Sequence, residues 1–173
     1  MIITPGVGFA TARFGMTVAE ALDVVGMPDR DFVEDNGDRC LCYNSFGMVL
    51  KFEELHEGRL GWIIIVGPEA TLWGHNPFSM RFSELEPLLD TRLNENKGRE
   101  DYGYWGTTTW EDSWLEVQHA LDRVQQINLG VRFDSSDNAL WAENIRAEQG
   151  MVGNPQQLPN FTSTAPLYPG AYI

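Results

Sequence analysis

Two runs of carboxylates are the first residues in this sequence that could carry out chemistry. The first run lies between positions 29 and 38 and contains Asp29, Asp31, Glu34, Asp35 and Asp38. The second run contains Glu53, Glu54 and Glu57. Paired carboxylates could hydrolyse a glycosidic bond or hold a divalent cation. Neither run has the spacing of a calcium-binding loop, and acids are common in solvated turns, so we expect turn residues rather than a hydrolytic or metal site.

Nucleophilic and metal-ligating side chains are few. The chain has three histidines, His56, His75 and His119, and two cysteines, Cys40 and Cys42. No pair of these histidines has the spacing of metal ligands, and none completes a zinc pattern with a cysteine. A Cys–His nucleophile pair stays open, because such partners need to be close only in space. The cysteines are too near each other in sequence for an unstrained mutual disulfide, which favours free thiols in a reducing compartment.

Sequence motifs for phosphate binding and for acyl hydrolysis are absent. Gly6-Val7-Gly8 is a glycine doublet with no third glycine at a helix start, so it is not a dinucleotide fingerprint. No P-loop and no nucleophile elbow occurs anywhere in the chain. We therefore expect a protein that is not an enzyme and that takes no cofactor and no metal.

The segment 100–114 combines aromatic and acidic side chains. Rings give rigid contact area and acids attract Lys and Arg, so this make-up is typical of a surface that binds a basic protein. The alternative, favoured for two of the three tryptophans, is that alternating aromatics in a strand form core and cross-strand pairs. With the second acidic run, the predicted partner-binding residues are Glu53, Glu54, Glu57, Tyr102, Tyr104, Trp105, Trp110, Glu111, Asp112 and Trp114.

The overall charge limits the class of partner. Among 173 residues, 25 acids face 12 bases, which gives a formal net charge of −13. Nucleic acids and anionic membranes are bound by Lys and Arg, so we expect neither as a partner. The N-terminus has no signal-peptide pattern, and the longest apolar run, 62–66, is too short to cross a bilayer. These features predict a cytoplasmic protein that meets a basic partner.

The first half of the chain predicts one helix and three strands. Thr17 and Glu20 have the spacing of a capping box, and Gly26 followed by Pro28 ends the helix, so the helix covers 18–25. Strand-like segments follow at 39–43, 48–53 and 60–66, with turn residues between them. We expect these three strands to pair in antiparallel succession.

The second half echoes this order. Ser83 and Glu86 indicate another helix start, and strand-like segments follow at 102–110, 114–118 and 123–130. An offset of 64 or 65 residues aligns the two halves, which predicts an internal duplication. The alternative is that any chain mixing helices and strands produces such echoes.

Residues 14–29, which read FGMTVAEALDVVGMPD, carry a resemblance to a known family. This stretch resembles the opening of beta-lactamase-inhibitor-like modules, an opening shared by small outer-membrane assembly lipoproteins and by small bacterial proteins of toxin–immunity loci. The resemblance implies a capped helix followed by a short antiparallel sheet, a module that the inhibitor proteins carry twice. The chain lacks the signal peptide and lipobox cysteine of the lipoproteins and the disulfide cysteines of the secreted inhibitors. What the resemblance implies is therefore an intracellular inhibitor or immunity protein with two modules.

These observations predict an α+β fold built as a tandem duplication. Residues 1–74 and 75–149 would each form a module of one short helix and an antiparallel three-stranded sheet, and the two sheets are free to join. Residues 150–173 carry no charge and hold four of the nine prolines, which predicts an extended tail packed on the domain or on a partner.

The function expected from the sequence is that of a non-catalytic, cytoplasmic immunity or inhibitor protein. Its partner would be a bacterial toxin with a basic surface, such as a nuclease. Two alternatives stay open. One is a structural or assembly module of a larger complex, and the other is a hydrolase that uses the clustered carboxylates.

Overall fold

The computed structural model describes residues 1–136 and 138–141, and the predicted tail at 150–173 lies outside the described residues. The described part contains two α-helices, α1 (Val18–Val25) and α2 (Phe82–Leu93). Its first strands are β1 (Ile2–Thr4), β2 (Gly8–Phe9), β3 (Ala12–Arg13), β4 (Arg30–Val33), β5 (Arg39–Tyr43), β6 (Met48–Glu53) and β7 (Arg59–Ile65). The later strands are β8 (Thr71–Leu72), β9 (Lys97–Asp101), β10 (Trp105–Trp110), β11 (Leu115–Ala120), β12 (Arg123–Gly130), β13 (Arg132–Phe133) and β14 (Ala139–Leu140).

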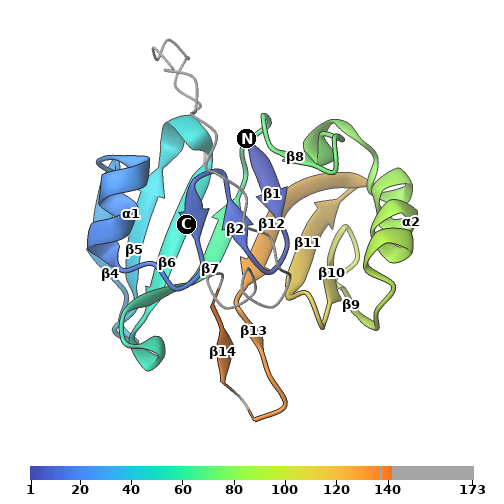
Figure 1. Cartoon of the computed structure of the whole chain (residues 1–173). Coiled ribbons are helices and arrows are strands. Elements are labelled where there is room, and N and C mark those ends of the chain that lie inside the picture. Colours follow the sequence, from blue (N-terminus) through green and yellow to red (C-terminus); the bar gives the residue numbers. More distant parts are fainter. Residues whose placement is uncertain (137, 142–173) are drawn as a thin grey trace.

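One antiparallel sheet of eight strands dominates the molecule (Figure 1). Its strand order is β4-β5-β6-β7-β12-β11-β10-β9. Each helix is followed along the chain by four strands of this sheet, and the two sets of four meet where β7 pairs with β12. That pairing sets Ile65 opposite Ile127 and Trp62 opposite Gly130. A small sheet of order β3-β2-β1-β8 and the β13–β14 hairpin complete the described fold.

The predicted fold class is wrong. In place of an α+β pair of modules with three strands each, the chain is mostly β, with fourteen described strands, two helices and one continuous sheet of eight. The missed strands β4 and β9 are the two edges of the sheet, and most of their side chains are exposed. Exposed edge strands need no apolar alternation, so hydrophobic periodicity does not reveal them. The boundary expected between residues 74 and 75 stays a prediction.

Local signals located the first helix correctly. The Glu20 N–H donates to Thr17 Oγ1 at 3.3 Å, and the Thr17 N–H donates to Glu20 Oε2 at 2.8 Å, which completes the predicted capping box. Gly26 ends α1 with φ of 98°, and its N–H donates to the Leu22 carbonyl at 2.9 Å. Strands β5, β6 and β12 have the predicted bounds.

The start of the second helix differs from the prediction. Ser83 is not the N-cap, because α2 begins after Arg81, whose N–H donates to Glu84 Oε2 at 3.1 Å. Ser83 instead donates from its N–H and its hydroxyl to the carboxylate of Asp122, in the turn between β11 and β12. Ser83 therefore bonds to a turn that is distant in sequence, where a local N-cap of α2 was expected.

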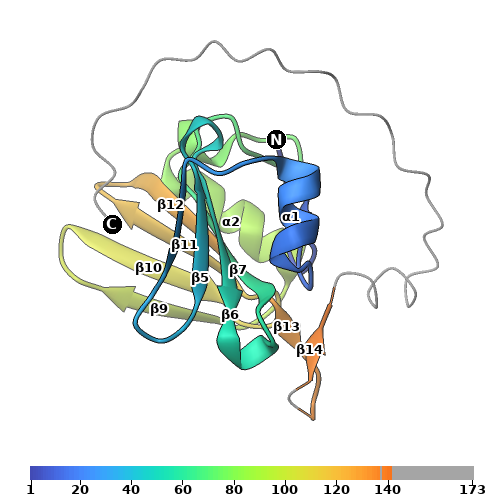
Figure 2. The same cartoon turned by 90° about the vertical axis from the view of Figure 1, so that its left-hand side faces the viewer.

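The hydrophobic core lies on one face of the eight-stranded sheet. Both helices and the small sheet cover that face (Figures 1 and 2). Strand register places one fully buried row of side chains across the centre of the sheet: Leu41, Leu50, Ile63, Leu129 and Leu115. Burying such side chains contributes roughly 1.5–3 kcal/mol each relative to exposure.

The other face of the eight-stranded sheet, called here the open face, has different side chains. Because side chains alternate along a strand, the residues that neighbour the buried row point the opposite way. The corresponding row on the open face is Cys42, Val49, Ile64, Asn128, Glu116 and Thr109. Within residues 1–136 and 138–141, neither helix lies on this face (Figure 2).

Candidate partner-binding surface

The structure distributes the predicted partner-binding residues over three places. Glu53 ends β6, the connection β6–β7 holds Glu54 and Glu57, and the connection β10–β11 holds Glu111, Asp112 and Trp114. The β9–β10 connection holds Tyr102 and Tyr104, and Trp105 begins β10. Trp110 ends β10 and is fully buried.

The two acidic connections lie at the same end of the sheet although they are far apart in sequence. β7 begins beside the end of β12, since Trp62 pairs with Gly130. β11 also begins beside the end of β12, since Leu115 pairs with Leu129. The turn before β7 and the turn before β11 therefore flank the same strand end. The exposed residues of these two turns are called here the acidic end: Glu54, Leu55, Glu57, Glu111, Asp112 and Trp114.

The carboxylates of the acidic end are not neutralised by neighbours. Within the described part of the chain, no Lys or Arg lies within ion-pair distance of Glu54, Glu57, Glu111 or Asp112. The one nearby guanidinium, that of Arg132, donates from Nε to the backbone carbonyl of Asp112 at 2.9 Å. Two apolar side chains are exposed among these acids, Leu55 at 89% and Trp114 at 41%. The acidic end thus offers negative charge and apolar contact area together.

Both turns at the acidic end have left-handed backbone at a residue other than glycine. Glu57 has φ of 58° and Trp114 has φ of 48°. Such residues are uncommon and are held by their surroundings. The Trp114 carbonyl accepts from the Gly130 N–H at 2.8 Å, and its ring lies edge-on to that of Trp62, with 5.9 Å between centroids. Gly130 makes this possible, because a Cβ there would lie 2.8 Å from the Trp62 ring.

The aromatic turn between β9 and β10 lies at the opposite end of the sheet. Tyr102 and Trp105 stack with 4.2 Å between ring centroids, and Tyr104 is 74% exposed. The Tyr102 hydroxyl donates to Glu100, and this hydrogen bond raises the pKa of the tyrosine. Gly103 has φ of 90° and donates its N–H to Asp101 Oδ1 at 2.8 Å, which closes the turn. These aromatics form a surface separate from the acidic end.

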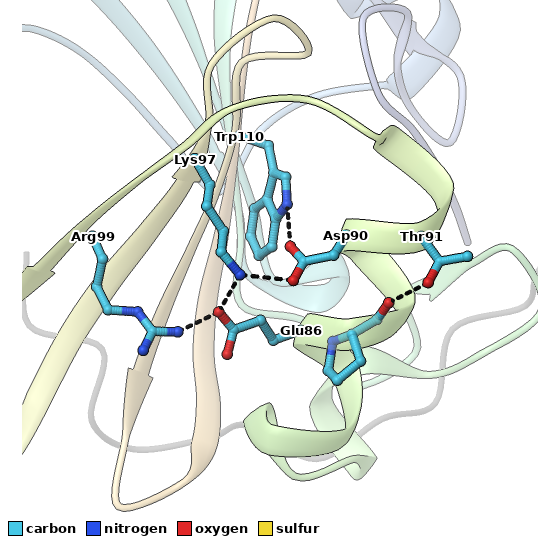
Figure 3. Close-up of polar contacts among 7 residues, drawn as sticks. Glu86, Asp90, Thr91, Lys97, Arg99 and Trp110 are labelled. Atoms are coloured by element: carbon cyan, nitrogen blue, oxygen red, sulfur yellow. Dashed lines mark hydrogen bonds and ion pairs between the residues drawn. The ribbon is translucent and has the colours of Figure 1, made fainter.

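Trp110 belongs to the core and is removed from the predicted surface. Its side chain is completely buried, and its Nε1–H donates to Asp90 Oδ1 of α2 at 3.0 Å (Figure 3). Asp90 also accepts from Lys97 Nζ of β9 at 2.7 Å. The indole therefore fixes α2 against the sheet, which is the core alternative that the aromatic alternation left open.

A polar network beside Trp110 ties α2 to the edge strand β9. Glu86 accepts from both Lys97 and Arg99 (Figure 3). Burial opposes ionisation of Glu86, but the hydrogen bonds from the two bases outweigh it and lower the pKa of the carboxyl. A polar hollow of about 570 Å³ adjoins this network, lined by Asp90, Asn94, Glu95, Asn96, Lys97 and Asp112. Lys97 and Arg99 of β9 thus bind carboxylates of α2 and hold that helix against the sheet.

The first carboxylate run serves the structure of β4 and β5. Asp31 forms a bidentate pair with Arg39 at 2.6 and 2.8 Å, and Asp29 accepts from the Asn44 N–H at 2.7 Å. Lys51 Nζ lies 2.8 Å from Glu34 and 2.9 Å from Asp38. These acids hold turns and strands together and do not gather into one site.

The cysteines and histidines are not brought together for catalysis. Cys40 and Cys42 are free and buried, and burial raises the pKa of the Cys40 thiol to about 12. His56 Nδ1 lies 2.9 Å from Glu53 Oε2, and His119 stacks on Phe82. No group of three or more His, Cys, Asp or Glu in the described residues could hold a metal ion.

The sequence reasoning missed a groove on the open face. This open-face groove has a volume of about 260 Å³ and is lined by Phe32, Glu34, Cys40, Val49, Lys51, Glu53, Trp62 and Ile64. The available signal was the segment 62–66, which is apolar at every position and so indicates an apolar face on both sides of its strand. By itself that pattern predicts a central strand and does not locate a groove.

Comparisons with known proteins identify no family. No protein-family model matches the chain, and no curated protein matches it. Among solved structures, the chain is similar to the 1.5 Å crystal structure of an extracellular protein containing a SCP domain from Bacillus anthracis str. Ames, at 11% identity and a TM-score of 0.42. The similarity covers 66% of this chain and 42% of that one. In the described residues, neither helix has the length and apolar character needed to span a membrane.

Proposed function

We propose that this protein is a non-catalytic binding protein whose acidic end contacts a basic protein. The more specific form of the proposal is an immunity or inhibitor protein that acts in the cytoplasm on a basic toxin such as a nuclease. The resemblance of residues 14–29 to inhibitor-like modules supports the class, and the formal net charge of −13 supports a basic partner.

One observation carries the proposal. Two turns separated by more than fifty residues of sequence present four carboxylates at one end of the sheet, and none of the four is paired with a described base. Unpaired surface acids repel one another, so a cluster of them gains more from an incoming cation than a scattered set does. Leu55 and Trp114 stand among these acids and supply apolar area that a charged surface needs for slow dissociation.

The direct test measures association with a panel of small purified nucleases of pI above about 9. Association rate constants would be recorded by biolayer interferometry between about 50 and 300 mM salt, with nuclease activity measured in parallel. The double charge reversal Glu54→Lys/Glu57→Lys should slow association roughly 10-fold at low salt and leave dissociation almost unchanged. Trp114→Ala should instead accelerate dissociation.

The matched control is Asp23→Lys/Glu69→Lys, which changes the net charge equally at two exposed positions away from the acidic end. Its effect on association should be much smaller. Equal effects of the two double reversals would overturn the assignment of the acidic end, and association indifferent to salt would overturn the charge argument. Binding that leaves nuclease activity intact would overturn the inhibitor form of the proposal.

A further inference from the structure

The open-face groove has apolar walls on a surface that otherwise bears many charges. Strand register brings Val49 opposite Ile64 and Lys51 opposite Trp62 on neighbouring strands. Phe32 of the edge strand β4 forms the other side of the groove. Val49, Trp62 and Ile64 are only half-buried, so apolar area there remains in contact with water. Removing such area from water contributes about 25 cal/mol per Å².

The rim of the groove is acidic. Its one base, Lys51, lies within 2.9 Å of two carboxylates, those of Glu34 and Asp38, and is therefore more than neutralised. Glu53 adds a further carboxylate at the end of β6. An occupant of this groove would need an apolar side chain for the walls and a positive charge for the rim.

The groove is continuous with the acidic end. Glu53 lines the groove and directly precedes Glu54 of the acidic end. On the other side, the Trp62 ring of the groove meets the Trp114 ring of the acidic end, edge-on at 5.9 Å. An extended segment of five or six residues spans roughly 17–20 Å, so one segment could contact both surfaces.

We propose that the open-face groove receives a cationic segment of the partner protein, in which a Leu-like or aromatic side chain enters between Val49, Trp62 and Ile64 while a flanking Lys or Arg meets the acidic rim. This inference rests on the proposed function and adds a second contact to it. The acidic end governs encounter, and the groove adds side-chain selectivity and slows dissociation beyond what Leu55 and Trp114 contribute.

The test uses three acetylated, amidated peptides added to the full chain. The first, KLKLK, carries both apolar and cationic side chains, KSKSK lacks the apolar ones, and ELELE reverses the charge. Methyl NMR signals of Val49 and Ile64 and the indole signal of Trp62 report on the groove, and the Leu55 methyls and Trp114 indole report on the acidic end. KLKLK should shift the groove signals at concentrations at which KSKSK shifts only the acidic end and ELELE shifts neither.

Variants separate the groove from the rest of the surface. Ile64→Lys places a charge inside the groove and should weaken KLKLK binding at least about 10-fold. Val33→Lys is the matched control, because Val33 is equally β-branched and 63% exposed on β4 but does not line the groove. Ile64→Thr serves as a milder second variant, and far-ultraviolet circular dichroism checks the folding of all three.

The outcomes distinguish this inference from the proposed function. The groove assignment would be overturned if Ile64→Lys and Ile64→Thr bind KLKLK as tightly as the wild type. It would also be overturned if the NMR shifts are confined to Leu55 and Trp114. Either result would leave the acidic end in place. A second outcome would overturn the proposed function: KLKLK still shifts the groove signals, but reversal of Glu54 and Glu57 has no effect on nuclease association. The groove would then remain a binding site for cationic peptides.

Discussion

On the open face, the side chains on the two sides of the β7–β12 pairing differ in chemistry. On β11 and β12, polar groups bind one another: Asn128 Nδ2 donates to Glu116 Oε1 at 2.6 Å, and Gln126 Nε2 donates to Asn128 Oδ1 at 2.8 Å. On β6 and β7, the neighbouring positions are Val49 and Ile64, which have no polar group to satisfy and keep apolar area in water. Ile64 and Asn128 stand directly opposite each other across the β7–β12 pairing.

This difference indicates which side chains of the open face would gain free energy from contact with another protein. A hydrogen-bonded network gains little from a partner, because each new contact must replace one already made. Exposed apolar area forms no such hydrogen bonds within the protein, and covering it with an apolar surface of a partner lowers the free energy. We therefore expect a partner to bind at the apolar positions of β6 and β7, whereas the polar network of β11 and β12 stabilises the sheet.

The largest expected effect separates the two faces of the same strand. Leu50→Ala should lower the free energy of unfolding by about 2–5 kcal/mol, because Leu50 is fully buried in the core and its truncation leaves a cavity. Val49→Ala, the adjacent position on the open face, should lower it by less than about 1 kcal/mol. Urea unfolding followed by fluorescence measures both, and equal losses would mean that something covers the open face in solution.

A smaller effect tests the polar half. Asn128→Ala should destabilise the protein by about 1–3 kcal/mol, because the partly buried Glu116 loses one of its donors and Gln126 loses its acceptor. Asn128→Asp keeps the size of the side chain but sets a carboxylate against Glu116, so it should be destabilising as well. Urea unfolding of both variants decides the point, and wild-type stability of Asn128→Asp would show that the network contributes nothing.

The smallest expected effect is a different acid response of the two halves. Burial lowers the pKa of His119 from 6.5, so the stability it contributes is present above that value and falls as pH decreases below it. In the other half, burial of Asp38 is outweighed by hydrogen bonds from Lys51 and the Glu54 N–H, and the pKa of Asp38 is lowered from 3.8. Stability contributed by Asp38 is therefore lost only as pH falls below 3.8.

Amide hydrogen exchange between pH 7 and pH 4 would measure this contrast. Protection in β10 and β11 should weaken before protection in β5 and β6, and His119→Phe should remove the early loss while keeping the stack on Phe82. Simultaneous loss in both halves would contradict the assignment to these two groups.

Elements with strong local signals were predictable from sequence. The capping box of Thr17 and Glu20 and the stop at Gly26 fixed the bounds of α1, and alternation fixed those of β6. The edge strand β9, Lys97–Asp101, has no apolar alternation, because its charges contact α2 and solvent instead. Without β4 and β9, each half is expected to have three strands in place of four, and the sequence leaves open whether the two sheets join.

The candidate site was predictable in residue type and not in position. Trp110 and Trp114 are four residues apart in the same aromatic segment, yet one is fully buried and the other is 41% exposed. The difference arises because Trp110 ends a strand under α2 and Trp114 lies in the following turn. Likewise, nothing local brings Glu57 to the same end of the sheet as Glu111, since long-range pairing of β7 with β12 does so.

The β7–β12 pairing also bears on how the chain reaches this fold. Within each set of four strands, neighbours are joined by short connections, so pairing needs only local loop closure. The β7–β12 ladder joins residues such as Ile65 and Ile127, which are separated by the whole of α2 and by four further strands, β8 to β11. Because the entropy cost of closing a loop rises with its length, we expect the two sets to form early and this ladder to form last. If β12 of a second chain paired with β7 before that moment, the two chains would exchange their second halves. Domain swapping would therefore begin at the β7–β12 ladder.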